Sequence, residues 1–252
     1  GLLNIQFAIK DEELFILEAN PRASRTMPFV AKVTGNQIIK AGTLLMLGYS
    51  IDEVRNKTKY LSSSSNKVAI KKAIFPWSRF PAEDTMLGPE MKATGEVLGV
   101  GKEFGTALNK AYAAAGVEIN NKEKGIFVTL SDSEKPNFIK TVNKYLELGF
   151  TLYSTEGTGK FLKTNGIDSV IVGKADDLGQ TSLTIIEDKL VSLVINTPTY
   201  ANELSDGWKI RRLSHETGVA VVSSVREADA FIEAFLNQNL VLDDLEVIQD
   251  VS

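Results

Sequence analysis

The apolar residues at the start of the chain gather in two short runs, and a helical spacing follows them. Residues 4–10 (NIQFAIK) and 14–20 (LFILEAN) are apolar-rich and are separated by the charged link Asp11-Glu12-Glu13, which predicts a β-hairpin. Pro21 has no N–H to give to a ladder, so the second strand should end there. Between residues 28 and 47 the apolar positions recur at helical spacing, and Gly35 predicts a break between two helices.

A polar and then an aperiodic stretch follow. Residues 56–67 (NKTKYLSSSSNK) include four consecutive serines and predict a surface loop. Residues 68–75 (VAIKKAIF) predict one further strand. Residues 76–100 show no clear period and contain three prolines, so we expect a connector laid across the first part of the chain.

After Gly101 short apolar strands alternate with helices. Strands are expected at 125–131, 150–155, 168–173, 191–197 and 219–224, and helices at 103–115, 134–148, 157–165, 205–217 and 225–238, with a helix or loop at 176–189. Strands this apolar are typical of a parallel sheet with helices on both faces. The pattern predicts right-handed crossovers in a doubly wound α/β domain at residues 98–252, preceded by an α+β part at residues 1–97.

Composition narrows the class of protein. The 252 residues are 43% hydrophobic and 24% charged, which is typical of a globular protein, and the net charge of −4 argues against a general nucleic-acid or anionic-membrane surface. With no cysteine and one histidine, disulfides, thiolate nucleophiles and Cys- or His-rich metal sites are excluded. No apolar run approaches the ~18 residues that span a bilayer, and no signal peptide is seen, so we expect a cytoplasmic protein. A chain that opens with Gly1 inside a strand is expected to be a fragment.

The end of the hairpin carries the first candidate site. Side chains two apart on a strand share a face, so Glu18 and Asn20 should point the same way. If the hairpin turns around Glu12, Gln6 lies opposite Glu18. Carboxylate and amide oxygens suit Mg²⁺ or Mn²⁺. An ordinary hairpin with polar residues on its solvent face explains the same spacing equally well.

Arginines follow the hairpin directly. Arg22 and Arg25 stand just beyond the strand end, where each guanidinium could bind a phosphate group bidentately.

A second constellation lies in the α/β part. Its members are polar or cationic residues that follow apolar strands or open helices: Lys135, Thr155, Thr158, Lys174, Asn196 and Thr197. The carboxyl edge of an open α/β sheet is where ligands bind, and a helix start at 155–158 would favour a phosphate. On the residues alone, threonines that cap helices and lysines that face solvent are the favoured interpretation.

The segment NIQFAIK…LFILEANPRASRTMPF resembles the end of the ATP-grasp domain in carbamoyl-phosphate synthase large chains, and LGPEMKATGEVLGVG (87–101) resembles the connector to their regulatory domain. The resemblance implies Mg²⁺ or Mn²⁺ on Gln6, Glu18 and Asn20, and the phosphates of ATP on Arg22 and Arg25. It implies that the second part is a flavodoxin-like, methylglyoxal-synthase-like domain whose pocket binds a phosphorylated effector such as UMP or IMP.

The same resemblance implies a ligase that makes carbamoyl phosphate from bicarbonate, glutamine-derived ammonia and ATP, for pyrimidine or arginine biosynthesis. Its partners would be the rest of the large chain and a glutaminase small subunit, and no nucleic acid or membrane. The resemblance covers one wall of the ATP-grasp site, so this fragment alone is not expected to turn over. Val221-Val222, where ornithine-activated members carry polar residues, argues against ornithine as an effector.

Two alternatives remain open. One is a stand-alone methylglyoxal-synthase-type lyase, which His215 as the single histidine and the lack of an aspartate next to residues 155–158 disfavour. The other is a non-catalytic nucleotide-binding module. Among the remaining residues, Trp77 is expected to pack in the interior, and the pairs Lys71-Lys72 and Arg211-Arg212 are expected to be exposed.

Overall fold

The structure is a computed structural model that describes residues 1–59, 67–77, 80, 85, 94–117, 119, 125–198 and 205–237. Contacts between Cα atoms divide the chain into two compact units, of which the first contains Gly1–Ala69 and the second begins at Ile70. The domain boundary that the sequence places near residue 98 stays a prediction.

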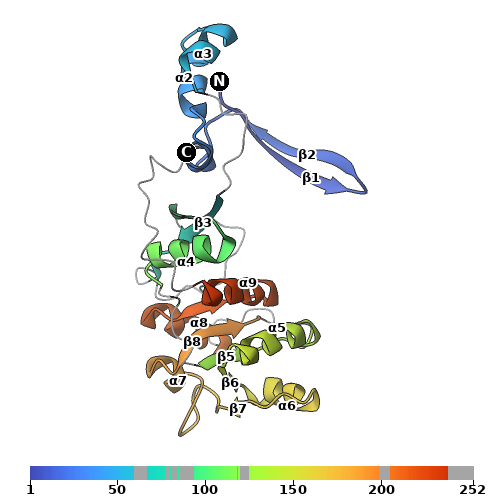
Figure 1. Ribbon diagram of the computed structural model, residues 1–252. Helices are drawn as coiled ribbons and strands as arrows, with labels where there is room; N and C mark the ends of the chain where they lie inside the picture. Colours follow the sequence, from blue (N-terminus) through green and yellow to red (C-terminus); the bar gives the residue numbers. More distant parts are fainter. Residues whose placement is uncertain are drawn as a thin grey trace. The chain divides into compact units, whose positions relative to one another are not determined.

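The first unit opens with the predicted hairpin, which Figure 1 shows as two long antiparallel arrows. Strand β1 spans Asn4–Lys10 and β2 spans Glu13–Asn20, and Lys10 pairs with Glu13 next to the turn. The two turn residues, Asp11 and Glu12, have φ values of 51° and 65°. Positive φ at both central residues is the geometry of a type I′ turn, whose twist matches that of the flanking strands.

In the described part of the first unit, three helices follow the hairpin. Helix α1 (Thr26–Thr34) ends at Gly35, whose φ of 68° closes the helix in the left-handed conformation, and α2 (Ile38–Met46) follows. The predicted helix pair with a break at Gly35 is therefore confirmed. Helix α3 (Ile51–Lys57), which the sequence did not predict, begins with a capping box between Ser50 and Glu53. Residues 60–66 of the predicted loop lie outside the described residues.

The second unit begins with a two-stranded sheet. Strand β3 (Val68–Ile74), as predicted, pairs with β4 (Gly95–Gly101). The expectation that residues 76–100 hold no regular element is wrong at its end, because three glycines among the seven residues of β4 conceal the strand signal. Gly99 is needed there, since a Cβ atom would collide with the carbonyl oxygen of Ala107 in α4 (Phe104–Ala114). Most of the segment between Trp77 and β4 lies outside the described residues.

The main sheet of this unit has five parallel strands. They are β5 (Gly125–Thr129), β6 (Thr151–Ser154), β7 (Val170–Ile171), β8 (Val191–Asn196) and β9 (Ala220–Val222). Their order is β7-β6-β5-β8-β9, with every pairing parallel, which confirms the doubly wound α/β class. Strand β7 is shorter than the predicted 168–173. The chain reverses its direction of winding between β5 and β8, and this is the topological switch point of the sheet.

Helices cover both faces of this sheet. They are α4, α5 (Lys135–Glu147), α6 (Glu156–Thr164), α7 (Thr184–Glu187), α8 (Asp206–Thr217) and α9 (Val225–Leu236) (Figure 1). Successive side chains of β5 point to opposite faces of the sheet, and the core is accordingly divided into two clusters. Ile126 and Val128 pack with apolar residues of α4, α5, α6 and α9. Phe127 points to the other cluster, with residues of α7 and α8. Within the described residues, no helix is long and apolar enough to cross a bilayer.

Two expectations about basic pairs need correction. Arg211 and Arg212 are 4% and 7% exposed rather than surface residues. Arg211 donates to Asn196 Oδ1 at 2.7 Å, and Arg212 donates to Glu216 Oε1 at 2.6 Å, so hydrogen bonds compensate for their burial. Of the lysine pair, Lys71 is exposed and Lys72 is partly buried.

Trp77 packs in the interior as predicted. Its side chain is 8% exposed, and its ring stacks on Phe75 with the two centroids 5.0 Å apart.

Candidate functional site

The polar side chains of the hairpin lie together at the end farthest from the turn. Gln6 pairs directly with Glu18, as the sequence predicts, so the two side chains leave the sheet on one face. Asn20 shares this face and donates its amide to Glu18 Oε1 at 2.9 Å. The three residues bring a carboxylate and two side-chain amides to one place.

A β-bulge keeps this polar end distinct from the apolar part of the hairpin. Gln6 pairs with Glu18 but Phe7 pairs with Ile16, which leaves Leu17 as the extra residue. Since Gln6 and Phe7 point to opposite faces, Glu18 and Ile16 do so too, although they are two positions apart. Because of the bulge, Gln6 and Glu18 share one face of the hairpin while Ile16 lies on the other face.

The two arginines follow the strand end. The backbone N–H of Arg22 donates to the carbonyl of Asn20 at 2.8 Å, which closes a tight bend after β2. Arg25 occupies the position before the first residue of α1. Both residues are exposed. Within the described residues, no group of three or more acidic or histidine side chains forms a metal centre. A cation here would instead rely on the mixed carboxylate and amide set, whose hard oxygen donors fit Mg²⁺ or Mn²⁺.

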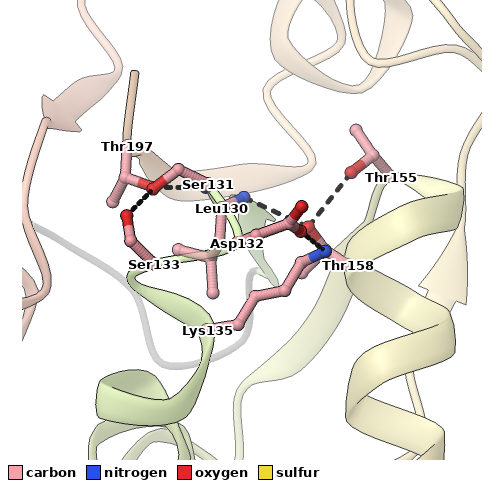
Figure 2. A network of polar contacts seen from close by, with 8 residues as sticks. All are labelled: Leu130, Ser131, Asp132, Ser133, Lys135, Thr155, Thr158 and Thr197. Atoms are coloured by element: carbon pink, nitrogen blue, oxygen red, sulfur yellow. Dashed lines mark hydrogen bonds and ion pairs between the residues drawn. The ribbon is translucent and has the colours of Figure 1, made fainter. Parts of the chain in front are cut away.

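A network of hydroxyl groups occupies the carboxyl edge of the five-stranded sheet, where β5, β6 and β8 end (Figure 2). The backbone N–H of Ser131, just after β5, donates to Thr197 Oγ1 at 2.8 Å, and the N–H of Leu130 donates to Thr158 Oγ1 at 3.1 Å. Thr155 also donates to Thr158 Oγ1, at 3.2 Å. The loops after three neighbouring strands are thus joined by threonine side chains.

Lys135, at the first turn of α5, reaches into this network. Its Nζ lies 2.6 Å from Asp132 Oδ1, in the loop that follows β5 (Figure 2). The lysine side chain is 15% exposed and the aspartate 95%. The hydrogen bond from Lys135 lowers the pKa of Asp132, so this carboxylate stays charged at neutral pH.

The start of α6 forms the next part of the edge. Thr155 precedes the helix, yet its side chain makes no capping hydrogen bond, because it donates to Thr158 instead. The predicted alternative, that this threonine serves as a helix cap, is therefore not what the structure shows. The first N–H groups of the helix remain without that side-chain acceptor.

Lys174 follows β7 and is exposed. Its backbone N–H donates to Asp177 Oδ2 at 2.7 Å, which fixes the loop. The pKa of Glu156 is lowered mainly by its hydrogen bond with Lys160, and the charge of Lys174 also lowers it. The positive charge of Lys174 therefore acts at the start of α6, where Glu156 is the first residue.

Asn196 and Thr197 complete the edge at the end of β8. They are 4% and 6% exposed, and Asn196 Oδ1 accepts a hydrogen bond from the buried guanidinium of Arg211. That bond orients the amide so that its NH₂ group is presented away from Arg211.

Sequence reasoning missed four residues of this edge: Ser131, Asp132, Ser133 and Arg211. The serine hydroxyls lie 3.2 Å apart, next to Thr197. The polar run directly after the apolar strand β5 was the signal that could have identified Ser131, Asp132 and Ser133. Arg211 gave no such signal, because the sequence pattern predicted that it lies on a solvent-exposed helix face.

Taken together, the edge is suited to binding rather than to proton transfer. Hydroxyls, an amide, cationic side chains and a helix start are the groups that hold a phosphate ester. Asp132 is a weak base because its pKa is lowered, and His215 lines a different cavity together with Lys72 and Trp77.

Comparison with known proteins gives two family matches. Residues 1–54 match the family model described as carbamoyl-phosphate synthase L chain, ATP binding domain. Residues 137–223 match the model described as MGS-like domain. The first match contains the hairpin residues, and the second contains most of the carboxyl edge of the sheet.

Relatives extend the likeness over nearly the whole chain. The chain is 38% identical over 242 residues to the carbamoyl phosphate synthase large chain, C-terminal section, of Methanocaldococcus jannaschii. The aligned region covers 93% of this chain and 39% of the relative. It is 38% identical over 248 residues to the corresponding section from Aquifex aeolicus, with 93% and 46% covered. With the large chain of Brucella suis, identity is 40% over 242 residues, with 93% and 21% covered. The chain thus spans less than half the length of each of these relatives.

Proposed function

Because the chain is homologous to the carboxy-terminal section of carbamoyl phosphate synthase large chains, we propose that it forms part of a ligase that makes carbamoyl phosphate. The substrates would be bicarbonate, ammonia released from glutamine, and ATP. The partners would be the rest of the large chain and a glutaminase subunit. In this role the first unit supplies one wall of a catalytic site and the second unit supplies regulation.

In the catalytic wall, Gln6, Glu18 and Asn20 would hold Mg²⁺ or Mn²⁺. The ion would neutralise charge on the phosphates of ATP as a phosphoryl group is transferred. The observation that supports this role is the shared face of Gln6 and Glu18, with Asn20 bonded to the same carboxylate. Arg22 and Arg25 would add countercharge beyond the strand end.

The α/β unit would bind a phosphorylated effector such as UMP or IMP at the carboxyl edge of its sheet. The observation that supports this site is the network in which the backbone N–H groups of Leu130 and Ser131 donate to Thr158 and Thr197. Lys135, paired with Asp132, follows in the same segment after β5. A phosphate seated there would meet hydroxyls, backbone N–H groups and the start of α6 together. Thr155, Lys174 and Asn196 border the same edge.

Regulation would follow from a difference in affinity. An effector changes the activity of the catalytic part only if it binds two states of the enzyme unequally, and the resulting coupling acts in both directions. The sequence at Val221-Val222 offers no charged group for an α-amino acid, so a nucleotide fits the unit better than ornithine does.

Calorimetric titration of the chain with UMP and IMP tests the effector site. We expect binding at millimolar ligand or below, and Lys135→Met should weaken it about tenfold because a charged hydrogen bond to phosphate is lost. Asp132→Asn should strengthen binding about two- to fivefold, because Lys135 is released from its ion pair. Lys140→Met, on the same helix, serves as the matched control and should leave affinity unchanged.

Three results would count against the proposal. Absence of heat with both nucleotides at millimolar concentration would remove the effector site. An equal loss in the Lys135 and Lys140 variants would reduce it to general charge attraction. Rapid formation of methylglyoxal from dihydroxyacetone phosphate would instead favour the lyase, and ATP hydrolysis by this chain alone would contradict the incomplete catalytic site.

A further inference from the structure

A second polar feature of the α/β unit lies away from the carboxyl-edge network. A cavity of about 370 Å³ is enclosed by β3, α4, α8 and the end of β9, a volume within the usual range for small-molecule sites. Apart from Arg211, none of its lining residues belongs to the phosphate edge described above.

Lys72 brings a cation into this cavity. Along β3 the less exposed side chains Ile70, Lys72 and Ile74 alternate with more exposed ones, so the lysine stands on the inward face between two isoleucines. Its Nζ lies 3.9 Å from the centroid of the Tyr112 ring, which is a cation–π contact. Burial lowers the pKa of Lys72, and the charge of Glu227 opposes that shift.

The ammonium group lacks an acceptor. In the part of the chain that the structure describes, Lys72 makes no hydrogen bond or ion pair, whereas its neighbour Lys71 is bonded to Glu96 Oε1 at 3.1 Å. Glu227 is engaged elsewhere, since its carboxylate accepts from the N–H of Ser223 at 3.0 Å. A partly buried ammonium group with three donors and no acceptor among the described residues is costly unless an anion joins it.

One part of the cavity wall is aromatic and carries no charge. Trp77 is buried, and its ring lies 5.7 Å from that of His215 at an angle of 44°. Burial, and then the charges of Lys72 and Arg212, lower the pKa of His215 to about 4, so this imidazole carries no charge at neutral pH. The hydroxyl of Thr85 also lines the cavity and is buried without a hydrogen-bond partner among the described residues.

We propose that this cavity binds a small organic monocarboxylate with a planar apolar body. The carboxylate would accept hydrogen bonds from Lys72 and Thr85, and the body would lie against Trp77 and His215. Arg211 and Lys71 also line the cavity, but Arg211 is hydrogen-bonded to Asn196 and Lys71 is paired with Glu96. Among the described residues, Lys72 is therefore the lining cation that can meet one negative charge, and the nearby acid Glu227 disfavours a dianion such as phosphate. Val221 and Val222, also in the lining, offer nothing to the ammonium group of an amino acid.

Benzoate and benzamide form a matched pair of probes, because they share shape and differ in charge. In a Trp208→Phe background, Trp77 is the remaining one of the two tryptophans and reports ligand entry by fluorescence. We expect benzoate to change this fluorescence at millimolar concentration or below, and benzamide to bind at least about tenfold more weakly. Lys72→Met should weaken benzoate about tenfold, and Lys140→Met, outside the cavity lining, should leave it unchanged.

Melting curves of each variant check that the fold is kept, and Thr85→Val gives a second, milder change that should weaken benzoate severalfold. Saturating UMP should not displace benzoate, so a failure here is distinguishable from a failure of the effector site. The proposal is overturned if benzoate and benzamide bind equally, if neither binds at 20 mM (roughly the weak limit for a specific site), or if the Lys140 variant loses as much affinity as the Lys72 variant.

Discussion

Apolar strand residues are exposed to solvent in the first unit and buried in the second. In the hairpin, Ile9 is 75% exposed and Ile16 is 65% exposed, although both belong to regular strands. In β8 of the α/β unit, all six residues are buried. The residue types are alike, and what differs is the presence of helices that cover the strand. The α/β unit stabilises its strands by packing, whereas the hairpin is held by its own ladder and turn.

The difference teaches where further protein should pack. Scattered exposed apolar residues are ordinary, but a run of them on one hairpin marks a surface that other protein covers. The relatives in which this section occurs are more than twice as long as the matched part. We therefore expect the hairpin to gain its missing contacts inside the whole enzyme.

The largest effect should come from removing one phenylalanine from each unit. Phe127→Ala in β5 empties a site that is 0% exposed and should lower the free energy of unfolding by about 3–5 kcal/mol. Phe15→Ala in β2, where the side chain is 46% exposed, should cost about 1 kcal/mol or less. Urea unfolding of both variants measures the contrast. Similar losses would mean that the hairpin is buried in solution, and the comparison between the units would fail.

Acid should weaken the α/β unit through His215. Its pKa is about 4 in the folded protein, lowered from 6.5 chiefly by burial, so stability is complete above pH 6.5 and is lost as the pH falls toward 4. Between pH 6.5 and pH 4 the unfolded chain binds a proton on His215 that the folded chain does not bind. The resulting loss in the free energy of unfolding is about 3 kcal/mol at pH 4.

Urea midpoints between pH 7 and pH 4.5, compared with those of His215→Gln, isolate this contribution from that of the carboxylates. The variant should lose less stability than the parent over the same interval. Parallel curves for the two proteins would show that His215 is not the group that titrates.

Helix caps should have nearly equal effects in the two units, because they act locally. Ser50 accepts from the N–H of Glu53 at 3.3 Å in α3, and Ser224 accepts from the N–H of Glu227 at 3.2 Å in α9. Each Ser→Ala change should cost about 1 kcal/mol. Hydrogen exchange of the amides in the two helices would measure both losses. A cap effect much larger in α9 would show that core packing, rather than the cap, is being disturbed there.

The hairpin and the α/β order were accessible from sequence because each rests on a strong periodic or local signal. The charged link at 11–13 located the turn, but the turn alone would place Gln6 opposite Leu17. The bulge at Leu17, which the sequence did not predict, brings Glu18 to that position. The strands at 125–129 and 191–196 are mostly apolar on both faces, which is typical of a sheet covered by helices on both sides.

Other features depend on tertiary contacts and gave no usable pattern. Strand β4 escaped notice because its glycines serve close packing against α4 and reduce its apolar content. Arg211 and Lys72 looked like surface residues because charge predicts exposure on average, and their burial depends on Asn196 and Tyr112, which are distant in sequence. At the phosphate edge, the threonines were found from their positions after strands, while Ser131 required knowing how the β5 loop folds back.

The bulge at Leu17 decides which side chain lies opposite Gln6. If Leu17 joined the ladder, the pairing that starts at Lys10 and Glu13 would place Leu17 opposite Gln6 and turn Glu18 to the other face. Deleting Leu17 would remove the bulge and still leave Glu18 opposite Gln6. In this hairpin the extra residue between turn and site is tolerated only because it stays outside the ladder, so a one-residue deletion would straighten the strand while keeping the donor set on one face.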